Sequence, residues 1–301
     1  MTKKRQKSGT KTSAFGTNHR INHDAEIFYS SNLYAEIEIK PAPSTIENEV
    51  PLEYQNKIIQ HTAENMYHLP DNCIHLMITS PPYNVTKTYD KNLLFSQYLS
   101  LLENVFKETY RVLVNGGRAC INVANLGRKP YIPLSDYISQ MMTKIGYNMR
   151  GEIIWHKGAG AGVSMAWGSW LSASNPVLRD THEYILIFCK GDFSRESKGK
   201  KSTISKENFM DWTKSVWTFN PESAKKVGHP APFPEELPHR LIQLFSFEND
   251  VILDPFMGSG TTAIAALKNK RRFVGYEIES QYIKLAQKRI ESFSHQITLD
   301  I

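Results

Sequence analysis

The sequence predicts an α/β protein built on a mainly parallel sheet, and three segments carry that prediction. An apolar run at 74–78 is ended by a rigid polar turn, as expected of a buried strand that delivers polar groups to its tip. A second apolar run at 251–253 is followed by an acidic residue and a Gly-x-Gly turn that opens a helix. A third strand, at 272–276, ends in Glu277, about 20 residues beyond those glycines. Strand tips of this kind are where α/β enzymes bind their ligands.

The other elements follow from the spacing of apolar residues along the chain. Segments with helical spacing predict helices, and short apolar or alternating runs predict strands. Helices are predicted at 62–66, 95–110, 136–145, 235–245, 263–267 and 281–292, and further strands at 57–60, 118–123, 149–155 and 183–189. The strands that end at residues 60, 79, 253 and 276 are expected to lie side by side with aligned carboxyl ends, which would bring the two turns together.

The first turn, Ser80-Pro81-Pro82-Tyr83, is suited to holding a flat ring that bears an amine. Its two consecutive prolines fix φ and remove two backbone donors, which leaves the Ser80 hydroxyl and nearby carbonyl oxygens as acceptors. Tyr83 would add an aromatic wall. The alternative is a proline-rich turn that only closes a strand.

The second turn, Asp254 to Thr262, has the form of a loop that binds a nucleoside cofactor. Its glycines let the backbone approach a ligand closely, and Glu277 is placed to hold ribose hydroxyls. A nicotinamide dinucleotide is disfavoured, because the third glycine of Gly-x-Gly-x-x-Gly is absent and a diphosphate would lie beside Asp254. An acidic residue there suits a cofactor that carries an ammonium group.

Together the two turns resemble the amino-methyltransferases of DNA, which methylate exocyclic amines with S-adenosyl-L-methionine. Because the catalytic motif precedes the cofactor loop, the chain is similar to the circularly permuted beta group of that family, over roughly residues 54–290. The resemblance implies a Rossmann-like methyltransferase fold with a small target-recognition insertion. It also implies domains at 54–158 (the catalytic half), 159–220 (target recognition) and 221–301 (the cofactor half). Before them, the polar and basic composition of 1–53 predicts a partly disordered arm and a wrapping segment.

The resemblance assigns roles to residues at both motifs. Ser80, Pro81, Pro82 and Tyr83 match the catalytic motif, and Asp254, Pro255, Phe256, Gly258, Ser259, Gly260, Thr261, Thr262 and Glu277 match the cofactor site. In that scheme Asp254 lies near the methionine ammonium, Thr261 and Thr262 hold the carboxylate, and Glu277 holds the ribose. The chain departs from the family twice. Residues 61–63 lack the acidic residue expected near adenine, for which Glu64 could substitute, and Phe233 stands where many relatives have a lysine.

DNA contacts are expected from the region that follows the strand at 149–155. It combines glycines and tryptophans with a lysine-rich stretch, which suggests groove entry and phosphate neutralisation. The candidate residues are Lys157, Trp167, Trp170, Lys198, Lys200 and Lys201. The alternatives are a solvated lysine loop and tryptophans that only pack. The basic first 23 residues could bind phosphate or serve as a solubilising tail.

The composition of the chain agrees with the prediction of a DNA-binding enzyme. The chain has 301 residues, a net charge of +6 and a pI near 9.0, which modestly favours a polyanionic partner. Its three cysteines are isolated in apolar stretches, which suggests reduced thiols in a cytoplasmic protein, and no metal site, signal peptide or membrane span is expected. The expected partner is double-stranded DNA. A cognate restriction endonuclease and the choice between monomer and homodimer are left open.

The expected reaction is methyl transfer to an amine of a base extruded from the duplex. The Ser80 hydroxyl oxygen and the Pro81 carbonyl would accept the amine hydrogens while Tyr83 stacks on the base. Serine at the first motif position is associated in the family with cytosine N4, and aspartate with adenine N6, so cytosine N4 is preferred and adenine N6 is the alternative. A nicotinamide-dependent oxidoreductase and a non-catalytic DNA-binding protein are the two other classes considered.

Overall fold

The computed structural model describes residues 29–83, 93–158, 167–222 and 233–299, and the chain divides at residue 40 into two units. The described part of the first unit holds one short 3-10 helix, η1 (Asn32–Tyr34), whose Tyr34 ring meets that of Tyr29 edge to face. The second unit contains the sheet and all the motifs discussed above. The basic segment at 1–23 lies outside the described residues.

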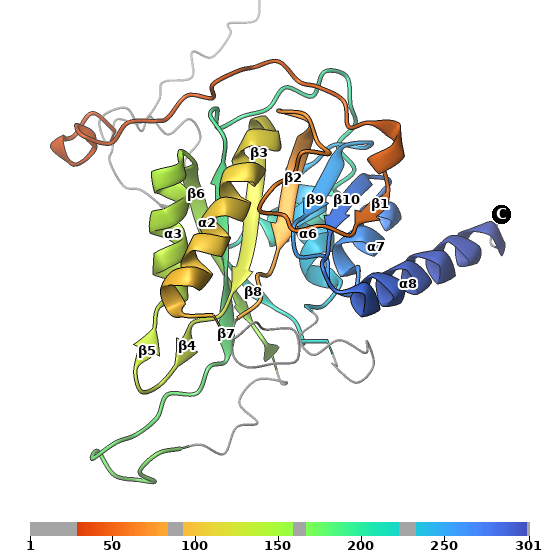
Figure 1. Ribbon diagram of the computed structural model, residues 1–301. Helices are drawn as coiled ribbons and strands as arrows, with labels where there is room; N and C mark the ends of the chain where they lie inside the picture. Colours follow the sequence, from red (N-terminus) through yellow and green to blue (C-terminus); the bar gives the residue numbers. More distant parts are fainter. Residues whose placement is uncertain (1–28, 84–92, 159–166, 223–232, 300–301) are drawn as a thin grey trace, which may run out of the picture. The chain divides into compact units, whose positions relative to one another are not determined.

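The described part of the second unit is organised around one eight-stranded sheet (Figure 1). In spatial order its strands are β1 (Lys57–Ile59), β10 (Arg272–Tyr276), β9 (Val251–Asp254), β2 (Ile74–Thr79), β3 (Leu113–Val123), β7 (His182–Cys189), β6 (Asn148–His156) and β8 (Val216–Thr218). All neighbours pair in parallel except β7, which is antiparallel to both β3 and β6. We call the side where the parallel strands end the carboxyl edge and the opposite side the amino edge. The predicted neighbourhood of the strands ending near residues 60, 79, 253 and 276 is confirmed.

Helices pack on the two faces of the sheet and give each face its own apolar core (Figure 1). On one face lie α2 (Phe95–Val112) and α3 (Leu134–Ile145), and on the other lie α4 (Lys206–Trp212), α6 (Glu236–Phe245) and α7 (Thr261–Lys268). The last helix, α8 (Ser280–Leu299), contacts α7. Two smaller elements, η2 (Leu52–Tyr54) and the hairpin of β4 (Leu126–Gly127) and β5 (Tyr131–Ile132), complete the described unit.

The apolar residues of the central strands alternate between these two cores. In β9, Val251 and Leu253 enter the core beneath α2 and α3, whereas Ile252 enters the core beneath α6 and α7. The continuous apolar runs seen in the sequence are therefore strands covered on both faces, as parallel strands of α/β proteins are. Polar chemistry is left to the strand tips.

The structure differs from the predicted elements at two places. The predicted helix at 62–66 is a turn-rich segment, because Glu108 of α2 accepts from the Met66 amide and Arg111 donates to the Met66 and Leu69 carbonyls. The strand predicted at 118–123 begins earlier, at Leu113, and Gly116 lies inside β3, where a φ of +73° accommodates an irregularity in the strand. The predicted range 159–220 contributes the buried strand β7 and the edge strand β8 to the same sheet.

Candidate active site

A pocket of about 290 Å³ opens at the carboxyl edge, where the tips of β1, β2, β9 and β10 lie side by side. The first turn and parts of the cofactor loop line it together, as the sequence predicted. Its walls are His61, Thr62, Ala63, Glu64, Ser80, Pro81, Pro82, Tyr83, Leu93, Tyr98, Leu101, Val105, Pro255, Phe256, Gly258, Tyr276, Glu277, Ile278, Glu279 and Tyr282. Residues nearly 200 positions apart in the chain thus share one cavity.

The turn that follows β2 is held in place by the Tyr83 hydroxyl. This oxygen accepts a hydrogen bond of 3.1 Å from the Ala124 amide, just beyond the end of β3, and lies 3.5 Å from the Ser80 Oγ. Burial raises the pKa of Tyr83 well above its ordinary value, with the nearby Glu183 carboxylate adding to the effect. Tyr83 is therefore neutral at physiological pH, and its ring is fixed against β3 while Ser80 faces the pocket.

The loop between β9 and α7 needs glycine where it turns into the helix. Gly260 caps α7 with a φ of +80°, in the left-handed region that favours glycine, and a Cβ there would come within 2.9 Å of the Ala286 Cβ. Arg289 of α8 supports the same turn by donating to the Ser259 carbonyl and, at 3.3 Å, to the Thr261 hydroxyl. The loop is thus packed against α8.

Glu277 stands at the tip of β10 with its carboxylate fixed by three backbone amides. Oε2 accepts from Gly258 at 2.9 Å, and Oε1 accepts from Ile278 and Glu279, each at 2.9 Å. Burial raises the pKa of Glu277. A carboxylate has about four lone-pair sites, so one remains on the pocket side for hydroxyl donors.

Asp254 is buried beside the pocket and does not line it, so its predicted contact with an ammonium group stays a prediction. It is 1% exposed, and its Oδ1 accepts from the Thr79 hydroxyl at 2.7 Å and from the Phe256 amide at 3.1 Å. Its Oδ2 accepts from the Thr262 hydroxyl at 2.7 Å. Burial raises the pKa of Asp254 to about 6, although these donors oppose the shift. The carboxylate therefore joins the strand tips beneath the pocket.

The other predicted cofactor residues divide between the pocket wall and the layer behind it. Pro255, Phe256, Gly258 and Glu277 line the pocket. Ser259, Gly260, Thr261 and Thr262 are buried and do not line it. The sequence could not separate the loop residues that line the pocket from those that shape the turn.

Several wall residues were not singled out from the sequence. Tyr98, Leu101 and Val105 come from α2, where they follow the same spacing as residues that only pack in the core, so no signal distinguished them. Glu64, named only as a substitute for a missing acidic residue, does line the pocket. Its Oε2 accepts from Asn104 of α2 at 3.1 Å, which holds the residue at the pocket rim.

Among the predicted DNA contacts, Lys157, Trp167 and Trp170 follow β6 on the carboxyl-edge side of the sheet. Lys157 donates to Glu183 at 2.6 Å, and Glu183 in turn accepts from Asn122 of β3 at 2.6 Å. Trp167 and Trp170 meet edge to face with ring centroids 5.3 Å apart. These three residues are on the same side of the sheet as the pocket.

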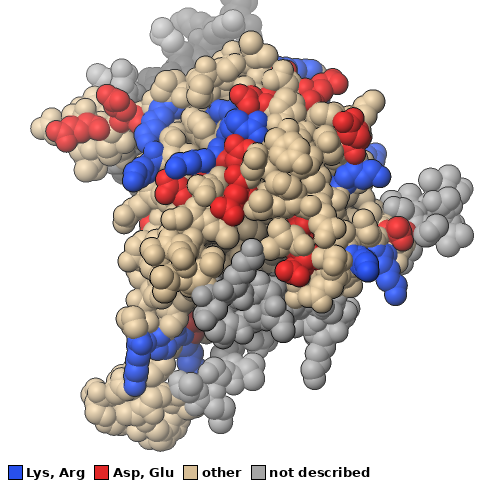
Figure 2. Space-filling model, in the orientation of Figure 1, with Lys and Arg blue, Asp and Glu red and all other residues tan. Residues whose placement is uncertain are grey.

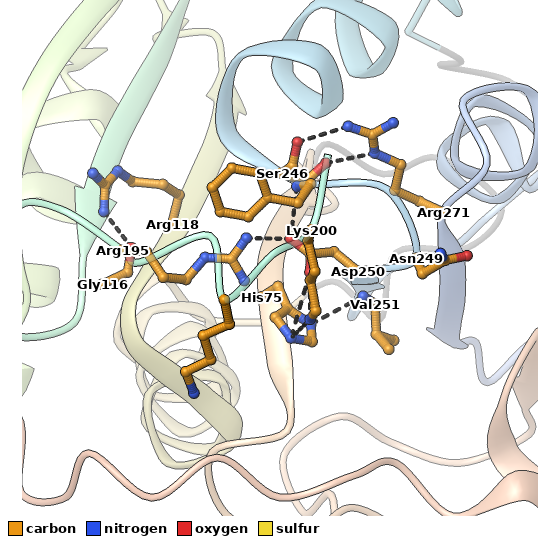
Figure 3. Close-up of polar contacts among 12 residues, drawn as sticks. His75, Gly116, Arg118, Arg195, Lys200, Ser246, Asn249, Asp250, Val251 and Arg271 are labelled. Atoms are coloured by element: carbon orange, nitrogen blue, oxygen red, sulfur yellow. Dashed lines mark hydrogen bonds and ion pairs between the residues drawn. The ribbon is translucent and has the colours of Figure 1, made fainter. Parts of the chain in front are cut away.

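The other three predicted contacts, Lys198, Lys200 and Lys201, are at the amino edge, because antiparallel β7 carries the chain there. Lys200 pairs with the buried Asp250 at 2.9 Å, beside His75 and Arg195 (Figure 3). Lys198 pairs with Glu47 at 2.7 Å, and the backbone oxygen of Lys201 accepts from the Glu248 amide. The structure thus places this lysine stretch on the side of the sheet opposite the pocket, where Lys198 and Lys200 join internal ion pairs.

An ion-pair network at the amino edge, which we call the amino-edge cluster, consists of Glu47, His75, Arg195, Lys200 and Asp250. Glu47 receives a hydrogen bond from His75, which holds the pKa of that carboxyl well below its ordinary value. The other ring nitrogen of His75 accepts from the Val251 amide at 3.0 Å, so His75 is neutral with its proton on Nε2. The cluster ties residues 47 and 200 to the starts of β2 and β9.

The part of the chain that the structure describes contains no candidate metal site and no candidate membrane span. No group of three or more His, Cys, Asp or Glu side chains in that part of the chain could hold a metal ion. None of the helices described is long and apolar enough to cross a membrane. The cysteines Cys73, Cys120 and Cys189 are all buried and unpaired.

Comparison with known proteins gives one consistent family. The model of the N6_N4_Mtase family, described as DNA methylase, matches residues 74–288. The chain is 32% identical over 296 residues to the type II methyltransferase M.MjaI of Methanocaldococcus jannaschii, which covers 83% of this chain and 96% of the relative. It also resembles a protein of Thermus thermophilus, assigned as a DNA modification methylase and solved with S-adenosyl-L-methionine, at 31% identity with a TM-score of 0.65 over 79% of this chain and 93% of that one.

A more distant structure shares the fold. The cytosine-N4-specific PvuII DNA methyltransferase superposes with a TM-score of 0.61 at 16% identity, over 86% of this chain and 96% of that one. The α/β architecture predicted from the sequence is therefore that of solved DNA methyltransferases. At this identity the comparison supports the fold alone.

Proposed function

We propose that this chain, which belongs to the N6/N4 DNA methylase family, transfers a methyl group from S-adenosyl-L-methionine to the exocyclic N4 amine of a cytosine in DNA. The family is S-adenosyl-L-methionine-dependent and modifies amino groups of DNA bases. The observation that carries the proposal is the shared pocket that joins the Ser80 turn to Glu277. Methyl donor and acceptor amine must meet in such a cavity for direct transfer.

The pocket residues fit the cofactor's nucleoside. Glu277 keeps one acceptor site while three amides hold it, which suits it to a ribose hydroxyl. Phe256 offers an aromatic face, and Gly258 lets the backbone approach closely. When bound, S-adenosyl-L-methionine supplies a methyl group already activated on a sulfonium centre.

The chemistry assigned to the chain is the preparation of a weak nucleophile. The lone pair of an exocyclic amine is delocalised into the base, so two well-placed acceptors are needed to draw the nitrogen toward tetrahedral geometry. The Ser80 Oγ and the Pro81 carbonyl are assigned to accept the two amine hydrogens, since the adjacent prolines hold both oxygens rigidly. Ser80 and Pro81 both line the pocket.

We assign Tyr83 to stack on the target base. Its hydroxyl is anchored to Ala124, so its ring orientation is fixed before substrate arrives. An amine in a duplex is engaged in base pairing, so the base must leave the stack to reach a pocket lined by Tyr83 and Pro82. Extrusion costs on the order of a few kcal/mol, which stacking and phosphate contacts can offset.

The DNA is assigned to the carboxyl-edge side of the molecule, where Lys157, Trp167 and Trp170 lie. Lys198, Lys200 and Lys201 are not part of this assignment, because they are at the opposite edge. A cognate restriction endonuclease that reads the same site, and the choice between monomer and homodimer, stay predictions from the resemblance.

The choice of cytosine rests on Ser80 alone. Serine at this motif position is associated with cytosine N4, whereas adenine N6 presents the same two hydrogens to the same acceptors and is the second candidate. A nicotinamide-dependent oxidoreductase would leave the Ser80 turn without a role. A non-catalytic DNA-binding protein would not need the fixed geometry of both motifs.

Nucleoside analysis tests the proposal. Unmethylated bacterial DNA is incubated with the protein and S-adenosyl-L-methionine and then digested to nucleosides, which are identified by mass spectrometry. We expect N4-methyldeoxycytidine as the product, and none when the cofactor is replaced by S-adenosylhomocysteine. N6-methyldeoxyadenosine as sole product would move the assignment to adenine, and no methylated nucleoside from a protein that binds the cofactor would contradict DNA as the substrate.

A further inference from the structure

A hairpin-like segment, residues 167–181, leads back into β7 at the carboxyl edge, and we call it the arm. Gly168 and Pro176 form an antiparallel bridge, and the Val177 amide donates to the Trp167 carbonyl at 3.0 Å. Figure 1 shows the arm, in green, projecting away from the lower end of the sheet beyond β4 and β5. The arm therefore extends from the carboxyl edge, the side of the sheet at which the pocket opens.

The tip of the arm is internally ordered by its own polar groups. The Ser169 amide donates to the Asn175 carbonyl at 2.9 Å, and the Ser169 hydroxyl bridges the Ser172 carbonyl and the Asn175 amide, each at 2.8 Å. The Ser174 amide donates to the Ser172 hydroxyl at 3.2 Å. With these bonds closed inward, the side chains between Ser169 and Ser172 are turned outward.

Those outward side chains are large and apolar. Trp170 is 66% exposed and Leu171 is 89% exposed, and Leu171 adopts a φ of +52°, a left-handed conformation that non-glycine residues seldom take. Leu178 on the returning strand is 84% exposed. Large apolar side chains exposed next to each other on a defined backbone, as Trp170 and Leu171 are, are typical of a surface that another molecule covers.

Hydrogen bonds and an ion pair connect the base of the arm to β3, the strand that precedes Ala124. Lys157, whose amide donates to the Thr181 carbonyl, pairs with Glu183, and Glu183 accepts from Asn122. Asn122 lies two residues before Ala124, whose amide holds the Tyr83 hydroxyl. A short chain of contacts therefore fixes where the arm begins relative to the Ser80 turn.

Basic side chains surround that base. The Arg179 guanidinium lies over the Trp167 ring, 3.9 Å from its centroid, and Arg128 of the β4–β5 hairpin pairs with Asp180 and donates to the Leu178 carbonyl. In Figure 2, which has the orientation of Figure 1, Lys and Arg side chains gather where the arm, at the lower left, joins the rest of the molecule. Over the upper part of the same face, basic and acidic side chains are interspersed. A cationic base with an apolar tip complements a polyanion whose grooves expose apolar base surface.

We propose that the arm binds duplex DNA beside the target base, with Trp170 and Leu171 inserted in a groove and Arg179 facing the phosphates. This inference rests on the proposed function, because it names how that site's substrate is held. Trp170 packs against base or sugar surface, and its orientation is set by its edge-to-face contact with Trp167, over whose ring Arg179 lies. Insertion removes the apolar tip from water, and this contribution to DNA affinity does not depend on salt. The Arg179 charge adds a contribution to DNA affinity that salt screens.

The two contributions can be separated experimentally in the full-length protein. Three variants are compared with the wild type. The tip variant carries both Trp170→Ala and Leu171→Ala, the second variant is Arg179→Ala, and Met210→Ala is the control. Met210 is 65% exposed on α4, outside the arm, and so controls for loss of an exposed apolar side chain. The measurements are the KM for unmethylated bacterial duplex DNA, kcat, the Kd for S-adenosyl-L-methionine, and DNA affinity as a function of salt.

We expect the tip variant to raise the KM for DNA at least tenfold, with kcat at saturating DNA and the cofactor Kd within twofold of wild type. Its slope of log affinity against log salt should match wild type, whereas Arg179→Ala should lower that slope by about one. Met210→Ala should match wild type throughout. An unchanged KM for DNA in the tip variant overturns the proposal.

The proposal is also overturned if the tip variant sediments as a monomer while the wild type is a dimer, because the apolar tip would then be the contact with a second copy of the chain. A wild type that binds the cofactor and methylates no DNA overturns the proposed function itself, and this result is seen before any variant is compared.

Discussion

The hydroxyl of Thr79 donates a 2.7 Å hydrogen bond to the Asp254 Oδ1, and this bond joins two residues 175 positions apart. Thr79 immediately precedes Ser80, and Asp254 immediately precedes the loop that lines the cofactor side of the pocket. Because Thr262 of α7 donates to the other oxygen of the same carboxylate, one buried group holds three elements together. The position of the Ser80 turn relative to the cofactor loop therefore depends on Asp254.

Thr79→Val tests this connection, because valine keeps the shape of threonine and removes only the donor. We expect the free energy of unfolding to fall by about 1–3 kcal/mol, the usual cost of depriving a buried charged acceptor of one donor. We also expect kcat to fall by about 10- to 100-fold, since small displacements of reacting groups have effects of that size. Equilibrium denaturation and steady-state kinetics measure the two effects.

Thr109→Val is the matched control. Thr109 is equally buried, but its hydroxyl donates only to the Val105 carbonyl within α2, a bond that adds little to helix stability. Its kcat should equal that of wild type. Equal losses of activity in the two variants would mean that burial of a threonine, and not its bond to Asp254, accounts for the effect.

Asp254 should also give stability a dependence on pH. Its folded-state pKa of about 6 lies above the ordinary value of 3.8, so folding favours the protonated form. That contribution is fully present below pH 3.8 and is lost as pH rises through about 6. Asp254→Asn does not titrate, so between about pH 3 and pH 8 its free energy of unfolding should gain about 3 kcal/mol relative to wild type. Parallel stability curves for the two proteins over this range would contradict the raised pKa.

Glu277→Gln should weaken cofactor binding specifically. The glutamine side chain has one oxygen in place of two, so it cannot accept from all three amides and still receive ribose hydroxyls. We expect the Kd for S-adenosyl-L-methionine to rise at least tenfold by calorimetry, with DNA affinity unchanged. Glu152→Gln, an exposed change on β6, is the control and should bind the cofactor as wild type does.

The sequence predicted those parts of the fold and pocket that depend on local signals. Ser80 to Tyr83 and Glu277 are each marked by a strand that ends in an unusual residue, and the rule that parallel strands align their carboxyl ends was enough to bring them together. Gly260 was recognisable because few residues other than glycine adopt its backbone conformation.

The sequence could not predict features that depend on side-chain partners or strand direction. Asp254 was expected to face the ligand, but only the packing of β2 beside β9 reveals that Thr79 reaches it. Lys200 was expected to contact DNA, but the antiparallel direction of β7 moves it to the amino edge and into contact with Asp250. Leu101 of α2 has ordinary core spacing, so its place in the pocket wall appears only in three dimensions.

The central claim is that Ser80 acts on the acceptor amine in a pocket that the cofactor shares. It is tested most directly by single-turnover methyl transfer from tritiated S-adenosyl-L-methionine to unmethylated DNA, at saturating concentrations of both, with Ser80→Ala. The control is Ser100→Ala, since the Ser100 hydroxyl donates only to the Ser96 carbonyl on α2. We expect Ser80→Ala to slow transfer at least 100-fold, about 2.7 kcal/mol in barrier, while the cofactor Kd stays within twofold of wild type. Transfer within twofold of wild type in Ser80→Ala, or a loss explained wholly by failure to bind the cofactor, would contradict it.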